Sequence, residues 1–155
     1  MAFARRAERT RNRNDLQRYR RGSLLPKGLL DGRLEEKVRP PFIRGSYDTA
    51  VFEAYKELEI RVREAAQLPS SALGKDLMRK AFHPDTGPLS NQNLDLAERE
   101  AMAHLFAGSI GLFKNPSSHR NVDLSPEEAL DLIFFADYLL RLIPQPSTPA
   151  PQPGP

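Results

Sequence analysis

Apolar residues recur at steps of three and four along most of the chain between residues 24 and 143, and no segment alternates with period two for long enough to predict a strand. The clearest stripe follows Ser46 and Asp48, either of which can cap a helix. It consists of Val51, Ala54, Tyr55, Leu58, Val62, Ala65 and Ala66. Because Pro69 follows, we expect this helix to end near Gln67.

The opposite face of the same helix is charged, and we expect it to be solvated. Two pairs on it, Glu57 with Arg61 and Glu59 with Arg63, have the i, i+4 spacing that favours ion pairs along a helix. The pattern therefore predicts an amphipathic helix with a single buried stripe.

Three further helical segments are separated by turn-forming residues. "LDGRLEEKVRPPF", residues 30–42, predicts a short helix that ends at Pro40-Pro41. A second short helix is expected over residues 73–82, followed by a loop over 83–93. Residues 101–113 are apolar on nearly every side, which is typical of a helix buried centrally or at a subunit contact. His104 within this segment is expected to be a hydrogen-bonded histidine of the core or its edge.

The last helix has clear start signals. Ser125 suits the N-cap, Pro126 suits the first helical position, and two glutamates follow near the positive end of the helix dipole. Its apolar residues form two rows, whereas one domain core needs only one. The second row contains Leu132, Phe135, Ala136 and Leu139. We expect part of this row to face a partner chain.

These patterns predict an all-α fold, a small antiparallel helical bundle, with three regions along the chain. Residues 1–23 are a basic arm that we expect to be disordered, residues 24–143 are the helical domain, and residues 144–155 are a proline-rich disordered tail.

Composition excludes several classes of protein. The 155 residues include no cysteine, which excludes a disulfide framework and a thiolate metal site. The three histidines, at positions 83, 104 and 119, include no i, i+4 pair, so we expect no metal site and no cofactor. No apolar run approaches a membrane span, and no apolar stretch follows the N-terminal arginines, so we expect a cytoplasmic protein.

The positive charge is concentrated at the N-terminus. Residues 1–22 hold eight arginines against Glu8 and Asp15. Such an arm predicts contacts with RNA phosphates, and a solvated tail is the alternative. The candidate RNA-binding residues are Arg5, Arg6, Arg9, Arg11, Arg13, Arg18, Arg20 and Arg21.

The segment "GLFKNPSSHRN", residues 111–121, allows two interpretations. Asn115-Pro116 ends a helix, and the two serines that follow are common turn formers. We therefore expect the preceding helix to end near Lys114 or Asn115. A turn with no chemical role would account for this pattern.

The same segment also has an inventory for phosphodiester chemistry. His119 can exchange a proton near neutral pH. Lys114 and Arg120 can balance charge on a phosphate, while Asn115 can orient it. No carboxylate falls within the segment to hold a metal ion, so metal-free chemistry fits it better than hydrolysis through magnesium.

Four segments, in order, carry a resemblance to a known family. They are "FIRGSYDTAVFEAYKELEIRVREAA", "GKDLMRKAF", "HLFAGSIGLFKNPSSHR" and "EEALDLIFFADYLLRLI". The match runs in order over about residues 30–143, and the four segments resemble the Ymh-like prokaryotic family of the HEPN superfamily. The resemblance implies an all-α bundle that often forms a homodimer. It also implies a signature of arginine, a polar residue, three further residues and histidine.

In active HEPN ribonucleases, two such signatures meet across the dimer and cut RNA without metal, commonly in phage defence, abortive infection or toxin–antitoxin modules. The polar position maps to Asn115 and the histidine to His119, while Lys114 occupies the arginine position. Arg120 is a second candidate cation.

Two functions remain open at this point. One is a metal-independent endoribonuclease acting in phage defence or a toxin-type stress response, with an antitoxin or defence protein as partner. The other is a non-catalytic HEPN module that binds RNA, a nucleotide or a protein, because a lysine stands where the signature has arginine.

Overall fold

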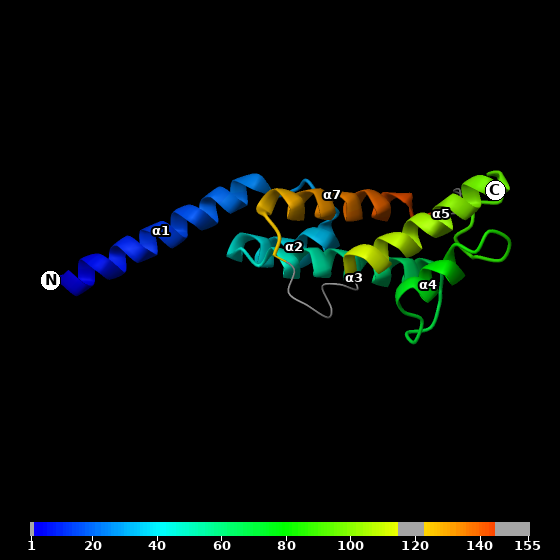
Figure 1. The fold of residues 1–155 in the computed structure, drawn as a ribbon, viewed down its shortest axis with the longest axis horizontal. Helices are drawn as coiled ribbons and strands as arrows, with labels where there is room; N and C mark the ends of the chain where they lie inside the picture. The colour runs from blue at the N-terminus through cyan, green and yellow to red at the C-terminus, as the bar shows by residue number, and fades with distance from the viewer. Residues whose placement is uncertain (1, 115–122, 145–155) are drawn as a thin grey trace, which may run out of the picture.

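The protein is all-α in the computed structural model, which describes residues 2–114 and 123–144, with side chains from residue 13 onward (Figure 1). Within these residues there are six α-helices and one short π-helix, η1. They are α1 (Ala2–Leu24), α2 (Gly32–Arg44), α3 (Tyr47–Ala65), α4 (Gly74–Ala81), α5 (Leu96–Ser109), η1 (Ile110–Lys114) and α7 (Pro126–Leu142). The predicted helical bundle is confirmed.

Helix α3 lies at the centre of the bundle. It packs against α2 and α7, and also against η1 and α4, while α5 lies mainly on α4. Its apolar stripe is buried except for the partly buried Ala65, and Tyr55, Leu58 and Val62 are fully buried. Figure 1 shows α1 extending away from this elongated body at the N-terminal end.

The arm that we expected to be disordered is helix α1 in the structure. Low apolar content limits how much of a segment can be buried, but it does not prevent a backbone helix. The arm is rich in arginine and alanine, which favour helix, and it contains no proline. Residues 145–155 of the predicted tail lie outside the described residues.

Helix α2 does not end at Pro40-Pro41 as we expected, but continues to Arg44. The prolines remove two backbone donors, yet Pro41 and Phe42 are buried against the core, which offsets that loss. Gly45 then ends the helix in the left-handed conformation, with φ of 85°, and donates its N–H to the carbonyl of Phe42.

The other predicted helix boundaries agree well with the structure. Helix α3 begins after Ser46 and ends just before Gln67, and α4 falls within the predicted residues 73–82. Helix α7 has Ser125 at its N-cap and Pro126 at its first position. The Ser125 hydroxyl accepts from the backbone of Glu128, whose carboxylate accepts from Ser125, so a capping box fixes this end.

The segment predicted over residues 101–113 is longer at its N-terminal end. Asp95 and Glu98 form a second capping box, which starts α5 at Leu96. The helix then widens into η1, whose last described residue is Lys114; the predicted helix end near Lys114 or Asn115 adjoins residues outside the described part and stays a prediction. This segment is not buried on all sides: Leu105 is 37% exposed and Leu112 is 64% exposed. His104 is also exposed, contrary to our expectation of a core or edge histidine.

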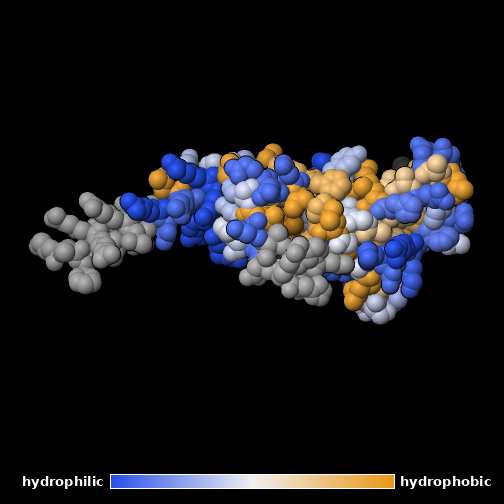
Figure 2. Space-filling model, viewed as in Figure 1, coloured by the Kyte–Doolittle hydropathy of each residue, from blue (hydrophilic) through white to orange (hydrophobic). Residues whose placement is uncertain are grey.

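The apolar row that we assigned to a partner chain lies largely in the protein's own core. Leu139 and Ala136 are fully buried, and Leu132 and Phe135 pack against the core. The exposed aromatic residues of α7 are instead Phe134 and Tyr138. Figure 2 shows apolar side chains gathered over α7 and α5 on the visible face. None of the helices in the described residues has the length and apolar character needed to cross a membrane.

Candidate functional site

The predicted signature begins at the end of η1. Lys114 is the last residue of this element, and its side chain is described. Asn115, His119 and Arg120 belong to residues 115–122, which lie outside the described residues. The structure therefore shows the helix end from which the predicted catalytic segment starts and the groups around it.

Aromatic packing fixes this helix end. The Phe113 ring lies between those of Tyr55 and Phe135, with centroid distances of 5.3 and 6.2 Å. The Tyr55 hydroxyl donates a 3.1 Å hydrogen bond to the carbonyl of Leu132, and burial raises the pKa of this phenol. Helices α3, η1 and α7 thus meet around a neutral Tyr55. The ring of Tyr55 packs on Phe113, which directly precedes Lys114 in the sequence.

Lys114 is held by a buried carboxylate. Its Nζ lies 2.8 Å from Oε2 of Glu59, and the Glu59 side chain is only 3% exposed. The Lys114 side chain is 17% exposed, so the pair has little contact with solvent. A short, shielded contact of this kind orients the ammonium group more firmly than a surface pair would.

Glu59 also holds two other groups. Its Oε1 lies 3.1 Å from Arg63 on the next turn of α3, and its Oε2 accepts the N–H of Gly74, the first residue of α4, at 2.9 Å. Arg63 in turn donates from Nε to the carbonyl of Ala72. One carboxylate therefore joins α3, the start of α4 and the end of η1.

Among the three side chains of this cluster, positive charges outnumber negative charges. Glu59 carries one negative charge, while Arg63 and Lys114 carry two positive charges, both largely shielded from water. A positive centre with low solvent access is suited to an anion such as a phosphodiester. No group of three metal-binding side chains occurs among the described residues.

Sequence reasoning missed Glu59 and Arg63 as site residues. We placed them on a solvated face, and their predicted i, i+4 pair does form. Glu59 is nevertheless buried, because α4 and η1 cover this side of α3. A single apolar stripe gave no sign that α3 has neighbours on several sides.

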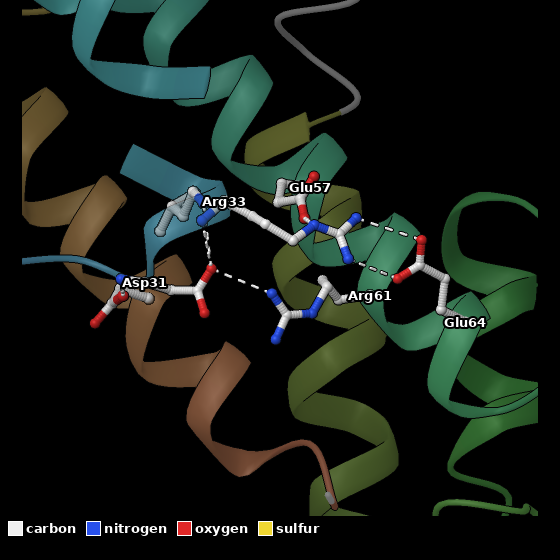
Figure 3. Close-up of polar contacts among 7 residues, drawn as sticks. Asp31, Arg33, Glu57, Arg61 and Glu64 are labelled. Atoms are coloured by element: carbon white, nitrogen blue, oxygen red, sulfur yellow. Dashed lines mark hydrogen bonds and ion pairs between the residues drawn. The ribbon is translucent and has the colours of Figure 1, made fainter. Parts of the chain in front are cut away.

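A second polar cluster joins α2 to α3 (Figure 3). Arg33 extends along α3 between Glu57 and Glu64, with its Nε 3.0 Å from Glu57 Oε1 and its Nη1 2.8 Å from Glu64 Oε2. Arg61 lies 3.1 Å from Asp31. The predicted Glu57–Arg61 pair is therefore replaced by contacts of each residue with α2 or its N-cap.

The pKa values of this cluster shift in opposite directions. Burial raises the pKa of Glu57, whose Oε1 lies near Arg33 Nε without forming a well-aligned hydrogen bond. The hydrogen bond from Arg33 lowers the pKa of Glu64 and raises that of Arg33.

The same cluster extends to α7. Asp31, the N-cap of α2, donates its N–H to Asp137, which also pairs with Arg141. The acids are matched by arginines on neighbouring elements, so the cluster acts as a clamp between α2, α3 and α7.

The arginines of α1 differ in their surroundings. Arg13, Arg18 and Arg20 are exposed. Arg21 instead donates to the carbonyl of Ile43 and lies over the ring of Tyr47. Gly45, whose φ of 85° favours glycine, leaves room for this guanidinium, since a Cβ there would lie 2.8 Å from Cζ of Arg21. Side chains of Arg5, Arg6, Arg9 and Arg11 lie outside the described residues.

Comparison with known proteins found one family. The model of the family described as "Protein of unknown function (Hypoth_ymh)" matches residues 29–143, which include every helix except α1. No curated protein and no solved structure matches the chain.

Proposed function

The chain belongs to the Hypoth_ymh family, and we propose that it is a metal-independent endoribonuclease of the HEPN type. The observation that carries this proposal is the positive centre formed by Lys114, Glu59 and Arg63. It stands at the residue from which a segment containing a histidine, an asparagine and a further arginine departs.

The roles of the residues follow from their chemistry. His119 acts as the general acid or base when a ribose 2′-hydroxyl attacks the neighbouring phosphodiester. Lys114 and Arg120 stabilise the charge on the pentacoordinate phosphate, and Asn115 orients it. Glu59 positions Lys114, because the carboxylate fixes one of the three N–H donors of the ammonium group.

The contact with Glu59 also favours a second candidate function. An ammonium group already bonded to a carboxylate has less capacity for a phosphate than the arginine fork that the HEPN signature contains. The alternative is a non-catalytic HEPN module that binds RNA, a nucleotide or a protein, with the arginines of α1 contributing to affinity.

The endoribonuclease proposal includes a homodimer, because two signatures must meet to complete the site. Phe134 and Tyr138 on α7 and Leu105 and Leu112 near the end of α5 supply exposed apolar area for a two-fold contact. We place the activity in the cytoplasm, in phage defence or a toxin-type stress response, with an antitoxin or defence protein controlling it.

The test is incubation of the purified full chain with single-stranded RNA of mixed sequence in EDTA. Attack by the 2′-hydroxyl leaves a 2′,3′-cyclic phosphate on the 5′ fragment and a free 5′-hydroxyl on the other. Mapping of the ends therefore separates this reaction from cleavage by a contaminating metal-dependent nuclease. Intact RNA that is bound by the protein would favour the binding module.

A further inference from the structure

A groove runs between α4 and α5 on the surface of the bundle. It consists of two adjoining hollows of about 410 and 390 Å³ that share Arg79 and His104. We call this the α4–α5 groove. The residues that matter for its chemistry are Lys75, Arg79, His83, His104, Gly108 and Gly111.

The α4 side of the groove presents cations and an imidazole at regular spacing. Lys75 and Arg79 are four residues apart on α4, about 6 Å along the helix, and His83 follows four residues later in the loop after α4 ends at Ala81. The Nδ1 atom of His83 accepts the N–H groups of Asp85 and Thr86, both at 3.3 Å. This turn orients the ring and leaves its proton on Nε2 in the neutral form.

The α5 side is formed by His104 and two glycines at helical spacing. A Cβ on Gly108 would have no neighbour within 4 Å, whereas a Cβ on Gly111 would lie 2.8 Å from Cδ of Lys75. The Lys75 side chain therefore lies directly against Gly111. Gly108 leaves the backbone of α5 open to close approach by a ligand.

Acidic groups do not cancel the positive charge of the groove. Glu100 lines one end, and Asp76 lies 3.5 Å from Arg79. The side chains of that pair are 82% and 65% exposed, so it holds Arg79 weakly. Lys75 has no carboxylate partner within the described residues.

Both walls of the groove are close in sequence to residues of the candidate site. Lys75 directly follows Gly74, whose N–H is bonded to Glu59, and Glu59 holds Lys114. On the other wall, Gly111 precedes Lys114 by three residues in η1. The walls of the groove thus continue along the chain toward Lys114, which itself lines neither hollow.

We propose that the α4–α5 groove binds single-stranded RNA and leads it to Lys114. This inference rests on the proposed function, because it says where the RNA substrate of the endoribonuclease binds. Lys75 and Arg79 contact successive phosphates, while the rings of His83 and His104 stack on bases or donate to them. Each hollow has the size of a small-ligand site, which suits one nucleotide at a time. A rigid duplex cannot enter hollows of that size, which is why the occupant is a single strand.

Gly108 offers a sharp test, because a side chain added there meets no neighbour. Gly108→Glu places a carboxylate in the groove, and Gly108→Gln is its neutral control of equal size. The measurement is the fluorescence anisotropy of labelled single-stranded RNA in EDTA, with every protein also carrying His119→Ala to prevent cleavage. We expect Gly108→Glu to weaken binding at least about tenfold relative to Gly108→Gln, because it repels the phosphates.

Two further comparisons locate the effect. Lys75→Ala should weaken binding, whereas Lys80→Ala, an exposed lysine on α4 that lines neither hollow, should not. Gly32→Glu introduces the same charge into a separate hollow between α1 and α2, again at a position where a Cβ meets no neighbour. Loss of affinity in Gly32→Glu but not in Gly108→Glu would overturn the inference, as would tighter binding of duplex RNA than of single-stranded RNA.

Failure of this inference can be told apart from failure of the proposed function. If the chain with His119 intact cleaves RNA but Gly108→Glu binds it as well as Gly108→Gln, the groove is not the RNA path and the endoribonuclease proposal stands. If Gly108→Glu loses affinity but that chain leaves RNA intact, the groove is confirmed and the catalytic proposal fails. Absence of RNA binding by the protein with an unaltered groove overturns both.

Discussion

Lys114 and Glu59, which are 55 residues apart in the sequence, are joined by a 2.8 Å contact between Nζ and Oε2. The contact ties the start of the predicted catalytic segment to the central helix α3. Because Glu59 also holds Arg63 and the N–H of Gly74, the position of the Lys114 ammonium group depends on three elements of the bundle.

The first prediction concerns the stability contributed by Glu59. Glu59→Gln removes the charge that balances Arg63 and Lys114, and it leaves two shielded cations near each other. We expect the free energy of unfolding to fall by about 3 kcal/mol, as measured by urea denaturation at neutral pH. Glu53→Gln is the matched control, because Glu53 has only one weak contact, with Lys56 at 3.5 Å. Equal stability of the two variants would show that the buried contact contributes nothing.

The second prediction concerns the pH dependence of stability caused by Glu57. Burial raises the pKa of Glu57 in the folded protein, so its protonated form is favoured by folding. Its contribution to stability is therefore greatest below its ordinary pKa and is lost as the pH rises through the raised value. Glu57→Gln, which removes the buried charge, should raise the free energy of unfolding at pH 7 by about 1 kcal/mol.

The gain from Glu57→Gln should shrink as the pH is lowered, because the native carboxyl then becomes protonated as well. The pH dependence of the contribution of Glu64 to stability has the opposite sign. Arg33 lowers the pKa of Glu64, so its contribution to stability is present above its ordinary pKa and is lost as the pH falls. Melting temperatures of the two Gln variants across pH 3–8 should diverge from the wild type in these opposite ways. If each variant differed from the wild type by the same melting temperature at every pH, the pKa shifts assigned to Glu57 and Glu64 would be refuted.

The helices were largely predictable because their start signals are local. Ser125 with Pro126, and the apolar stripe after Ser46, mark helix starts without knowledge of the rest of the fold. The continuation of α2 through Pro40-Pro41 was not predictable, because it depends on the burial of Pro41 and Phe42 in the core. The helicity of α1 was missed because low apolar content was taken to mean disorder.

The candidate site was predictable only in part. Lys114 could be identified from its place before Asn115-Pro116, and it is the last described residue of η1. Its partner Glu59 could not, since burial of that side chain requires α4 and η1 to pack on α3. Exposure of His104 likewise follows from the orientation of α5, which a nearly uniform apolar sequence does not fix.

The third prediction concerns the homodimer. If two copies meet through the exposed apolar residues of α5 and α7, Phe134→Asp should convert a dimer to a monomer with little change in melting temperature, because Phe134 is 39% exposed. Leu16→Asp is the control, since Leu16 is 52% exposed and lies on α1, which extends away from the body. Light scattering measures the mass of each variant in solution. A monomer mass for the unaltered protein at micromolar concentration would contradict the proposed active site formed by two copies.

The fourth prediction concerns the arginines of α1. Exposed Arg13, Arg18 and Arg20 can be replaced together by Gln without disturbing Arg21, which anchors the helix through Ile43. If all three contact phosphates, the slope of log affinity for single-stranded RNA against log salt should become shallower by about 2. An unchanged slope would assign these arginines to a solvated surface. Replacing the exposed Lys37, Lys56 and Lys80 together by Gln is the control for the same change in net charge.

The most direct test of the central claim is the rate of RNA cleavage in EDTA at neutral pH for three proteins: the wild type, His119→Ala and Lys114→Arg. A guanidinium at position 114 can keep one donor on Glu59 and direct others to a phosphate, so we expect Lys114→Arg to cleave faster than the wild type. We expect His119→Ala to cleave RNA about 10²- to 10⁴-fold more slowly, with an unchanged melting temperature. Intact RNA with both the wild type and Lys114→Arg as purified dimers, or undiminished cleavage by His119→Ala, would contradict the endoribonuclease account.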